Sequence, residues 1–149
     1  MNKTSANTAI RKAEMQDAAT LKTCIERAYA PVRLKLSDLP DVSAGIEEDI
    51  AGNEVFIAET DGCTAGCAIL SFDGSRAHLS NIAVDPDFKG QGIGKALIGA
   101  VEAAARAKEV PVIHLATHVS MPENVALYSR LGWLETQRTG NKVLMEKSL

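Results

Sequence analysis

Three glycines alternate in DPDFKGQGIGKAL, residues 85–97, where an apolar helical pattern begins. Each glycine costs conformational entropy on folding, so removing three side chains from one loop must serve a purpose. Gly90, Gly92 and Gly94 would let backbone N–H groups approach an anion at the start of the helix, where the helix dipole favours negative charge. The spacing therefore predicts a phosphate-binding loop rather than a plain tight turn.

The loop does not follow two common phosphate-binding motifs. A Walker A motif has a glycine separated by four residues from its Gly-Lys pair and a Ser or Thr after the pair, but Lys89 and Ala96 stand at those places. The dinucleotide fingerprint GxGxxG would need a third glycine where the chain has Lys95 or Leu97. A different class of phosphate ligand is therefore expected.

Hydrophobic periodicity predicts the elements that must position this loop. Their order, β-α-α-β-β-β-α-β-α-β-β, predicts an α/β (α+β) fold with a mixed, mostly antiparallel sheet flanked by helices. The first helix is expected to follow Asp17 and to end near Pro31. The expected strands are 8–13, 54–60, 63–72, 76–84, 110–117, 133–139 and 142–148, and the other expected helices are 44–51, the segment from the loop to about 108, and 120–132.

Composition limits the class of partner. The 149 residues are 46% hydrophobic, which suits one domain over residues 1–149. The net charge of −3 argues against nucleic acid, and no apolar run is long enough to span a membrane. Three cysteines without a CxxC pair predict reduced thiols and a cytoplasmic protein. No metal is expected, because His114 and His118 would lie about 13 Å apart along a strand.

Two motifs together resemble the GNAT superfamily of N-acetyltransferases, which bind acetyl-CoA. The first is a strand ending in Ile82-Ala83-Val84 followed by the glycine loop, and the second is NVALYSRLGW, residues 124–133, beyond a further strand. The resemblance covers most of the chain, from Ile10 to Lys147, because the order of elements agrees as well. One departure is Lys89, which stands where the family commonly has Gln or Arg; it keeps a positive charge but lacks a planar fork.

The resemblance implies how acetyl-CoA is held: the strand before the loop would splay from its neighbour and leave backbone groups free for the pantetheine arm. The loop would bind the pyrophosphate, Val84 would pair with a pantetheine amide, and the Ile82 N–H would face the thioester carbonyl. Lys89 and Lys95 would either contact phosphate or remain solvated. The implied cofactor-binding residues are Ile82, Ala83, Val84, Lys89, Gly90, Gln91, Gly92, Gly94, Lys95 and Asn124.

A short helix is expected to supply the acid. Ser120 and Glu123 fit a capping box, and Asn124 and Tyr128 would share one face. The resemblance makes Tyr128 the group that protonates the CoA thiolate, as an alternative to a packing role. Many family members carry an Asn two turns before this tyrosine, where the chain has Met121.

The sequence indicates the general base and the acceptor-binding site less clearly than the acetyl-CoA site. His118 is favoured as the base, with His78, Glu47 and Glu48 as alternatives. The acceptor pocket is expected to include Tyr29 and Arg33, from the irregular-looking stretch AYAPVRLKLSDLP, and His78.

These inferences predict a cytoplasmic N-acetyltransferase that transfers an acetyl group directly from acetyl-CoA to a small-molecule primary amine. The absence of cysteine from both motifs disfavours an acetyl-cysteine intermediate. The alternatives are a protein N-terminal or lysine acetyltransferase and, in another class, a CoA-binding sensor without turnover. A homodimer is left open.

Overall fold

The computed structural model describes the backbone of residues 8–35 and 45–149 and the side chains of residues 8–31 and 45–149. Within these ranges seven strands form one sheet in the order β1-β2-β3-β4-β5-β7-β6, with every neighbouring pair antiparallel except β4 and β5. The strands are β1 (Thr8–Lys12), β2 (Glu54–Thr60), β3 (Cys63–Asp73), β4 (Arg76–Val84), β5 (Val112–His118), β6 (Leu134–Thr139) and β7 (Lys142–Ser148).

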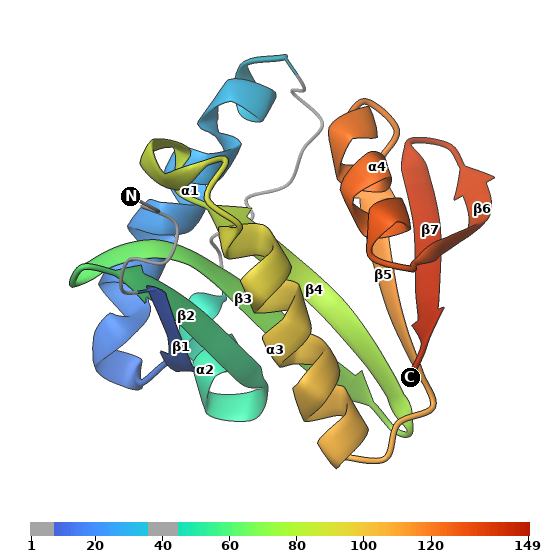
Figure 1. Ribbon diagram of the computed structural model, residues 1–149, viewed down its shortest axis with the longest axis horizontal. Coiled ribbons are helices and arrows are strands. Elements are labelled where there is room, and N and C mark those ends of the chain that lie inside the picture. The colour runs from blue at the N-terminus through green and yellow to red at the C-terminus, as the bar shows by residue number, and fades with distance from the viewer. Residues whose placement is uncertain (1–7, 36–44) are drawn as a thin grey trace, which may run out of the picture.

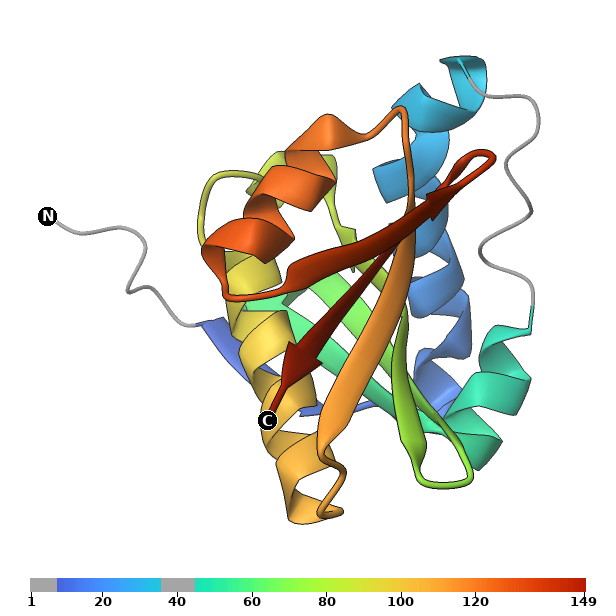
Figure 2. The same cartoon turned by 90° about the vertical axis from the view of Figure 1, so that its right-hand side faces the viewer.

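Helices cover both faces of the sheet (Figures 1 and 2). α3 lies on one face, and α1 and α2 lie on the other. The helices are α1 (Ala18–Lys35), α2 (Ile46–Gly52), α3 (Ile93–Ala107) and α4 (Pro122–Arg130), with short 3-10 helices η2 (Met15–Asp17) and η3 (Pro86–Phe88). This arrangement confirms the expected fold class and order of elements.

Alternation along the strands explains the two apolar layers. On β2, Phe56 and Ala58 face the layer formed with α3, whereas Val55 and Ile57 face the layer formed with α1 and α2. The α3 layer is built around Leu97, Ile98, Val101, Ile113, Trp133 and Met145, and the second layer around Leu21, Ile25, Ile46, Ile57 and Ile69.

β4 and β5 pair only at one end. In the parallel pairing of these two strands, Ala77 pairs with Ile113 and His78 pairs with His114. Beyond these pairs β4 continues alongside β3, and β5 continues alongside β7, so the two strands diverge toward the glycine loop and α4 (Figure 1). The sheet therefore opens into a V at the point where the two motifs meet.

One expected helix boundary is wrong, and another lies outside the described residues. α1 does not end near Pro31 but continues to Lys35, which places Tyr29 and the backbone of Arg33 in the helix rather than in an irregular segment. A proline inside a helix deprives one carbonyl of its donor and can bend the helix without ending it. α2 begins at Ile46, and its expected start at residue 44 lies outside the described residues.

α4 begins differently from the expectation as well. Pro122 occupies the first helical position, so Met121 becomes the N-cap and no side chain caps the helix. The Ser120 N–H instead donates to Nδ1 of His118 at 3.0 Å. The expected capping box of Ser120 with Glu123 is therefore wrong.

No helix among the described residues is long and apolar enough to cross a membrane.

Candidate active site

The glycine loop joins η3 to α3 with two residues in the left-handed backbone region. Gly90 and Gly92 both have φ of 79°, a conformation that other L-residues rarely adopt. A Cβ added to either would find no described heavy atom within 4 Å, so the loop faces open space. Gly94 is helical and needs no positive φ; a Cβ there would lie 3.8 Å from Val84 and Leu127.

The open space belongs to a cavity of about 760 Å³ between α1, the end of β4, the glycine loop, α3 and α4. The N–H groups in the first turn of any helix lack intrahelical acceptors, and those of α3 begin at this cavity. The predicted residues that line it are Tyr29, Ile82, Ala83, Val84, Lys89, Gly90, Gly92, Gly94, Lys95, Asn124 and Tyr128.

The inner wall is the end of β4. Ile82, Ala83 and Val84 pair with Ala68, Cys67 and Gly66 of β3, and among the described residues none of them has a register partner on β5. One edge of β4 is thus available to an extended ligand, as in β-strand addition. The arrangement suits a long molecule whose phosphate end lies at α3 and whose chain runs along β4.

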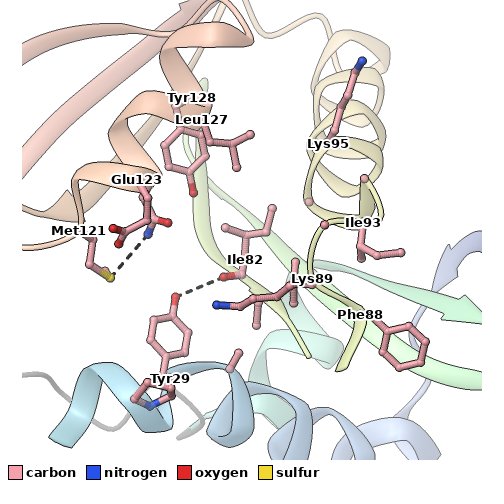
Figure 3. A pocket seen from close by; sticks show the side chains of 18 of the residues that line it. Tyr29, Ile82, Phe88, Lys89, Ile93, Lys95, Met121, Glu123, Leu127 and Tyr128 are labelled. Atoms are coloured by element: carbon pink, nitrogen blue, oxygen red, sulfur yellow. Dashed lines mark hydrogen bonds between the residues drawn. The ribbon is translucent and has the colours of Figure 1, made fainter. Parts of the chain in front are cut away.

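Tyr128 places a neutral phenol in the cavity. It is buried, and its ring packs against Trp133 with centroids 5.8 Å apart. Figure 3 shows its hydroxyl directed into the cavity from α4. Burial, together with Tyr29, raises the pKa of Tyr128 above its ordinary value. The group therefore keeps its proton near neutral pH and can act as a proton donor.

Tyr29 approaches β4 from α1, opposite Tyr128 (Figure 3). Its hydroxyl lies 3.1 Å from Oδ1 of Asn81 and 3.3 Å from the carbonyl oxygen of Ile82. Burial first, and the charge of Cys67 second, raises the pKa of Tyr29 to about 12. Both phenols of the cavity are thus protonated at neutral pH.

Charged side chains are distributed unevenly around the cavity. Lys89, Lys95 and Arg130 are basic, and Glu123 is acidic. Lys89 extends into the cavity on the side of Tyr29, whereas Lys95 runs away from both tyrosines (Figure 3). The positive balance suits an anionic ligand.

Asn124 contacts its own helix. Its amide nitrogen lies 3.6 Å from Sδ of Met121, the residue at which the resemblance would place an asparagine. Both residues line the cavity, so Met121 presents an apolar surface at the place where an amide would otherwise stand.

The other predicted site residues lie elsewhere. His118 and Gln91 are not among the described residues that line the cavity. His78 faces His114 at the paired end of β4 and β5, with ring centroids 5.6 Å apart. The side chain of Arg33 lies outside the described residues.

Several lining residues were not anticipated from the sequence. Phe88 and Ile93 flank the glycine loop, so their nearness in the chain was a usable signal. The remaining ones come from α1, from α4 and from the two residues before α4, where only the fold shows which side meets β4: Ala28, Pro31, Ser120, Met121, Glu123, Leu127 and Arg130.

A metal centre is not part of this arrangement. Over residues 8–31 and 45–149, no three or more His, Cys, Asp or Glu side chains are placed to hold a metal ion.

Comparison with known proteins identifies relatives. The model of the acetyltransferase (GNAT) family matches residues 21–133. An acetyltransferase of Pectobacterium atrosepticum is 33% identical over 75 residues, which cover 50% of this chain and 53% of that relative. The match thus spans about half the length of this curated relative.

Solved structures share the fold at low identity. PaiA N-acetyltransferase of Thermoplasma acidophilum, solved in complex with coenzyme A, has a TM-score of 0.86 and 18% identity over 96% of this chain and 99% of that one. The ribosomal-protein-S18-alanine N-acetyltransferase of Escherichia coli has a TM-score of 0.74 and 24% identity over 95% of this chain and 94% of that one. The family match over residues 21–133 confirms the resemblance carried by the two motifs: the chain belongs to the acetyltransferase (GNAT) family.

Proposed function

We propose that the protein is an N-acetyltransferase that transfers an acetyl group from acetyl-CoA to a primary amine of a small molecule, directly and within a ternary complex. The observation that carries the proposal is one cavity that joins the glycine loop, the open edge of β4 and the buried Tyr128.

The cavity suits the parts of acetyl-CoA in sequence. Backbone N–H groups from Gly90 to Lys95 would bind the pyrophosphate, supported by the dipole of α3 and by nearby lysines. The open edge of β4 would pair with the pantetheine arm, with Val84 bonding one of its amides. Asn124 would contact the same arm from α4. Gln91 belongs to the loop, and we propose only a backbone role for it.

The chemistry requires stabilisation of an oxyanion and protonation of a thiolate. As the amine nitrogen forms its bond to the thioester carbon, the Ile82 N–H would stabilise the negative charge on oxygen. The carbon–sulfur bond then breaks with its electron pair on sulfur, and Tyr128 would donate its proton to that sulfur. Tyr128 regains a proton, through solvent, from the nitrogen that has gained a bond.

The amine must lose a proton before it attacks, and His118 remains our proposed base. Its Nδ1 accepts the N–H of Ser120, a residue that does line the cavity. We propose that His118 acts through a water molecule on this side. His78, at the far end of β4, is the less suitable alternative because its ring faces His114 instead.

We propose that a small acceptor binds in the part of the cavity away from α3. Tyr29 and Met121 lie on this side of the cavity (Figure 3), and Pro31 lines the cavity as well. Arg33 follows in the same helix and remains a proposed contact for an acceptor carboxylate. We also propose a cytoplasmic location, on the grounds of the three free cysteines.

Calorimetry with CoA and a thiol-release assay test the proposal. The amine panel includes amino acids, small amines, a peptide with a free N-terminus and a peptide lysine. Turnover of small amines supports the proposal, and turnover confined to the peptides would move the acceptor to a protein. CoA binding without turnover of any amine would favour a sensor, and no CoA binding would refute the proposed function.

A further inference from the structure

Arg27 of α1 holds the segment that leads into the glycine loop. Its Nε donates to Oδ2 of Asp85 at 2.8 Å, and its Nη2 donates to Oδ1 of Asp85 and to Oδ2 of Asp87, both at 3.2 Å. The two contacts to Asp85 form a bidentate pair, the geometry in which Arg is most specific. Fifty-eight residues separate Arg27 from Asp85, so the pair joins two distant elements.

Asp85 makes several of the hydrogen bonds that hold the segment before the glycine loop. It is 8% exposed, and its backbone N–H donates to the carbonyl of Ala65 at 2.8 Å. Its side chain accepts the N–H of Asp87 at 2.9 Å, and its carbonyl accepts the N–H of Phe88 at 2.9 Å. These bonds form η3, which continues directly into Lys89 and Gly90. The hydrogen bonds from Arg27 lower the pKa of Asp85, which keeps the carboxylate ionised at neutral pH.

The loop itself has few means of holding its position. Gly90 and Gly92 have no side chains, and a Cβ at either would contact no described atom. The position of the loop is therefore imposed from its ends, which are η3 on one side and the buried Ile93 of α3 on the other. An anion site made of backbone N–H groups binds well only when these groups are already oriented.

We propose that Arg27 is a positioning residue for the cofactor loop, acting through Asp85 and Asp87 to hold the loop in the conformation that binds the pyrophosphate. The inference rests on the proposed use of acetyl-CoA. Arg27 is not among the described residues that line the cavity, so its effect passes through the two aspartates.

The first test compares Arg27→Met with Lys22→Met. Both residues lie on α1 and are partly exposed, and Lys22 pairs with Glu47 of α2 at 2.9 Å, away from the loop. Calorimetry should show about tenfold weaker CoA binding for Arg27→Met and no change for Lys22→Met. Arg27→Lys, which keeps the charge without the fork, should give an intermediate loss.

A shortened cofactor separates loop positioning from general damage to the site. S-Acetylpantetheine carries the thioester but no pyrophosphate. In a thiol-release assay with an accepted amine, Arg27→Met should raise the KM for acetyl-CoA about tenfold while leaving kcat/KM for S-acetylpantetheine unchanged. An equal loss for both cofactors would overturn the inference, because it would show damage beyond the pyrophosphate site.

Removing the negative charge of either aspartate separates loop positioning from simple electrostatics, because the two explanations predict opposite changes in CoA affinity. Asp85→Asn and Asp87→Asn each remove a negative charge near the loop, so electrostatic attraction alone would strengthen CoA binding. Positioning predicts weaker binding for both, with the larger loss at Asp85, and melting temperatures are measured alongside. Unchanged or stronger binding in folded Asp87→Asn and Arg27→Met would overturn the inference while the proposed function stands. Wild-type protein that binds no CoA would overturn both.

Discussion

Removing the hydroxyl of Tyr128, in Tyr128→Phe, tests the proposed acid with little disturbance of the fold. The ring that packs on Trp133 is retained. Among the described residues the hydroxyl has no hydrogen-bond partner, so its removal leaves no buried group unsatisfied. The free energy of unfolding should change by less than about 1 kcal/mol, which corresponds to a shift of about 2–4 °C in Tm.

The expected loss of rate in Tyr128→Phe follows from the acidities of the Tyr128 phenol and of the departing CoA thiol. Burial raises the pKa of Tyr128, so the phenol is a weaker acid than usual. The departing thiol has a pKa of about 8.5 and leaves reasonably well without help. General acid catalysis typically raises a reaction rate about 10²- to 10⁴-fold. Because Tyr128 is a weak acid and the thiolate is a good leaving group, we expect its contribution to be at or below about 10²-fold. We expect kcat to fall at least about tenfold, equivalent to about 1.4 kcal/mol.

The assay is steady-state thiol release, with CoA affinity measured separately by calorimetry. CoA affinity should stay within about threefold, because the hydroxyl acts on the transition state. Since the pKa of Tyr128 is raised, its acid form persists across the range from pH 6 to 9, and the wild-type rate should rise with pH as the amine loses its proton. An unchanged kcat in Tyr128→Phe, under conditions where chemistry limits the rate, would assign thiolate protonation to water or another group.

Three further variants probe the loop, the thiols and the core. Gly92→Val should weaken CoA binding by tenfold or more, whereas Gly74→Val imposes comparable backbone strain at the β3–β4 turn and should leave affinity unchanged; equal affinities in calorimetry would contradict the role of the loop. Replacing all three cysteines with alanine should preserve turnover, and a large loss in a folded protein would reopen covalent catalysis through a thiol. Lys147→Met should lower the free energy of unfolding by about 1–3 kcal/mol in urea titrations, because it removes the ammonium 3.0 Å from the buried Glu102 carboxylate and leaves the Trp133 indole at 3.3 Å and the more exposed Arg106 at 3.6 Å; a loss below about 0.5 kcal/mol would show that the pair contributes little.

The sequence was sufficient where a local rule decides the structure. Gly90 and Gly92 could be placed in a special loop because positive φ and open approach both favour glycine. The strands were predicted from alternation, and the place of Tyr128 at the cavity was predicted from the motif NVALYSRLGW, residues 124–133. Each of these signals lies within a few consecutive residues.

Features that depend on contacts between distant segments could not be predicted from local sequence patterns. No local pattern indicates that β4 and β5 pair at two positions and then diverge; only the resemblance to the family implied that the strand before the loop splays from its neighbour. The pairing of Arg27 with Asp85 joins residues on separate elements, and either side chain alone looks like an ordinary surface charge. Pro31 suggested a helix end, and only the continuation of α1 shows that Tyr29 approaches β4 from a helix.

The divergence of β4 and β5 has a thermodynamic consequence. One sub-sheet, β1 to β4, and the other, β5 to β7, are joined within the sheet through two residue pairs. The cavity where they diverge is lined by β4 and by α4, the helix between β5 and β6, so a ligand there would link the two halves of the fold and resist their separation. Such a ligand binds the folded chain and not the unfolded one, and at a hundred times its Kd it adds about 2.7 kcal/mol to the free energy of unfolding. If acetyl-CoA binds as proposed, the stability of this protein in a cell depends on the concentration of acetyl-CoA, and depletion of acetyl-CoA removes the link that it makes between β4 and α4.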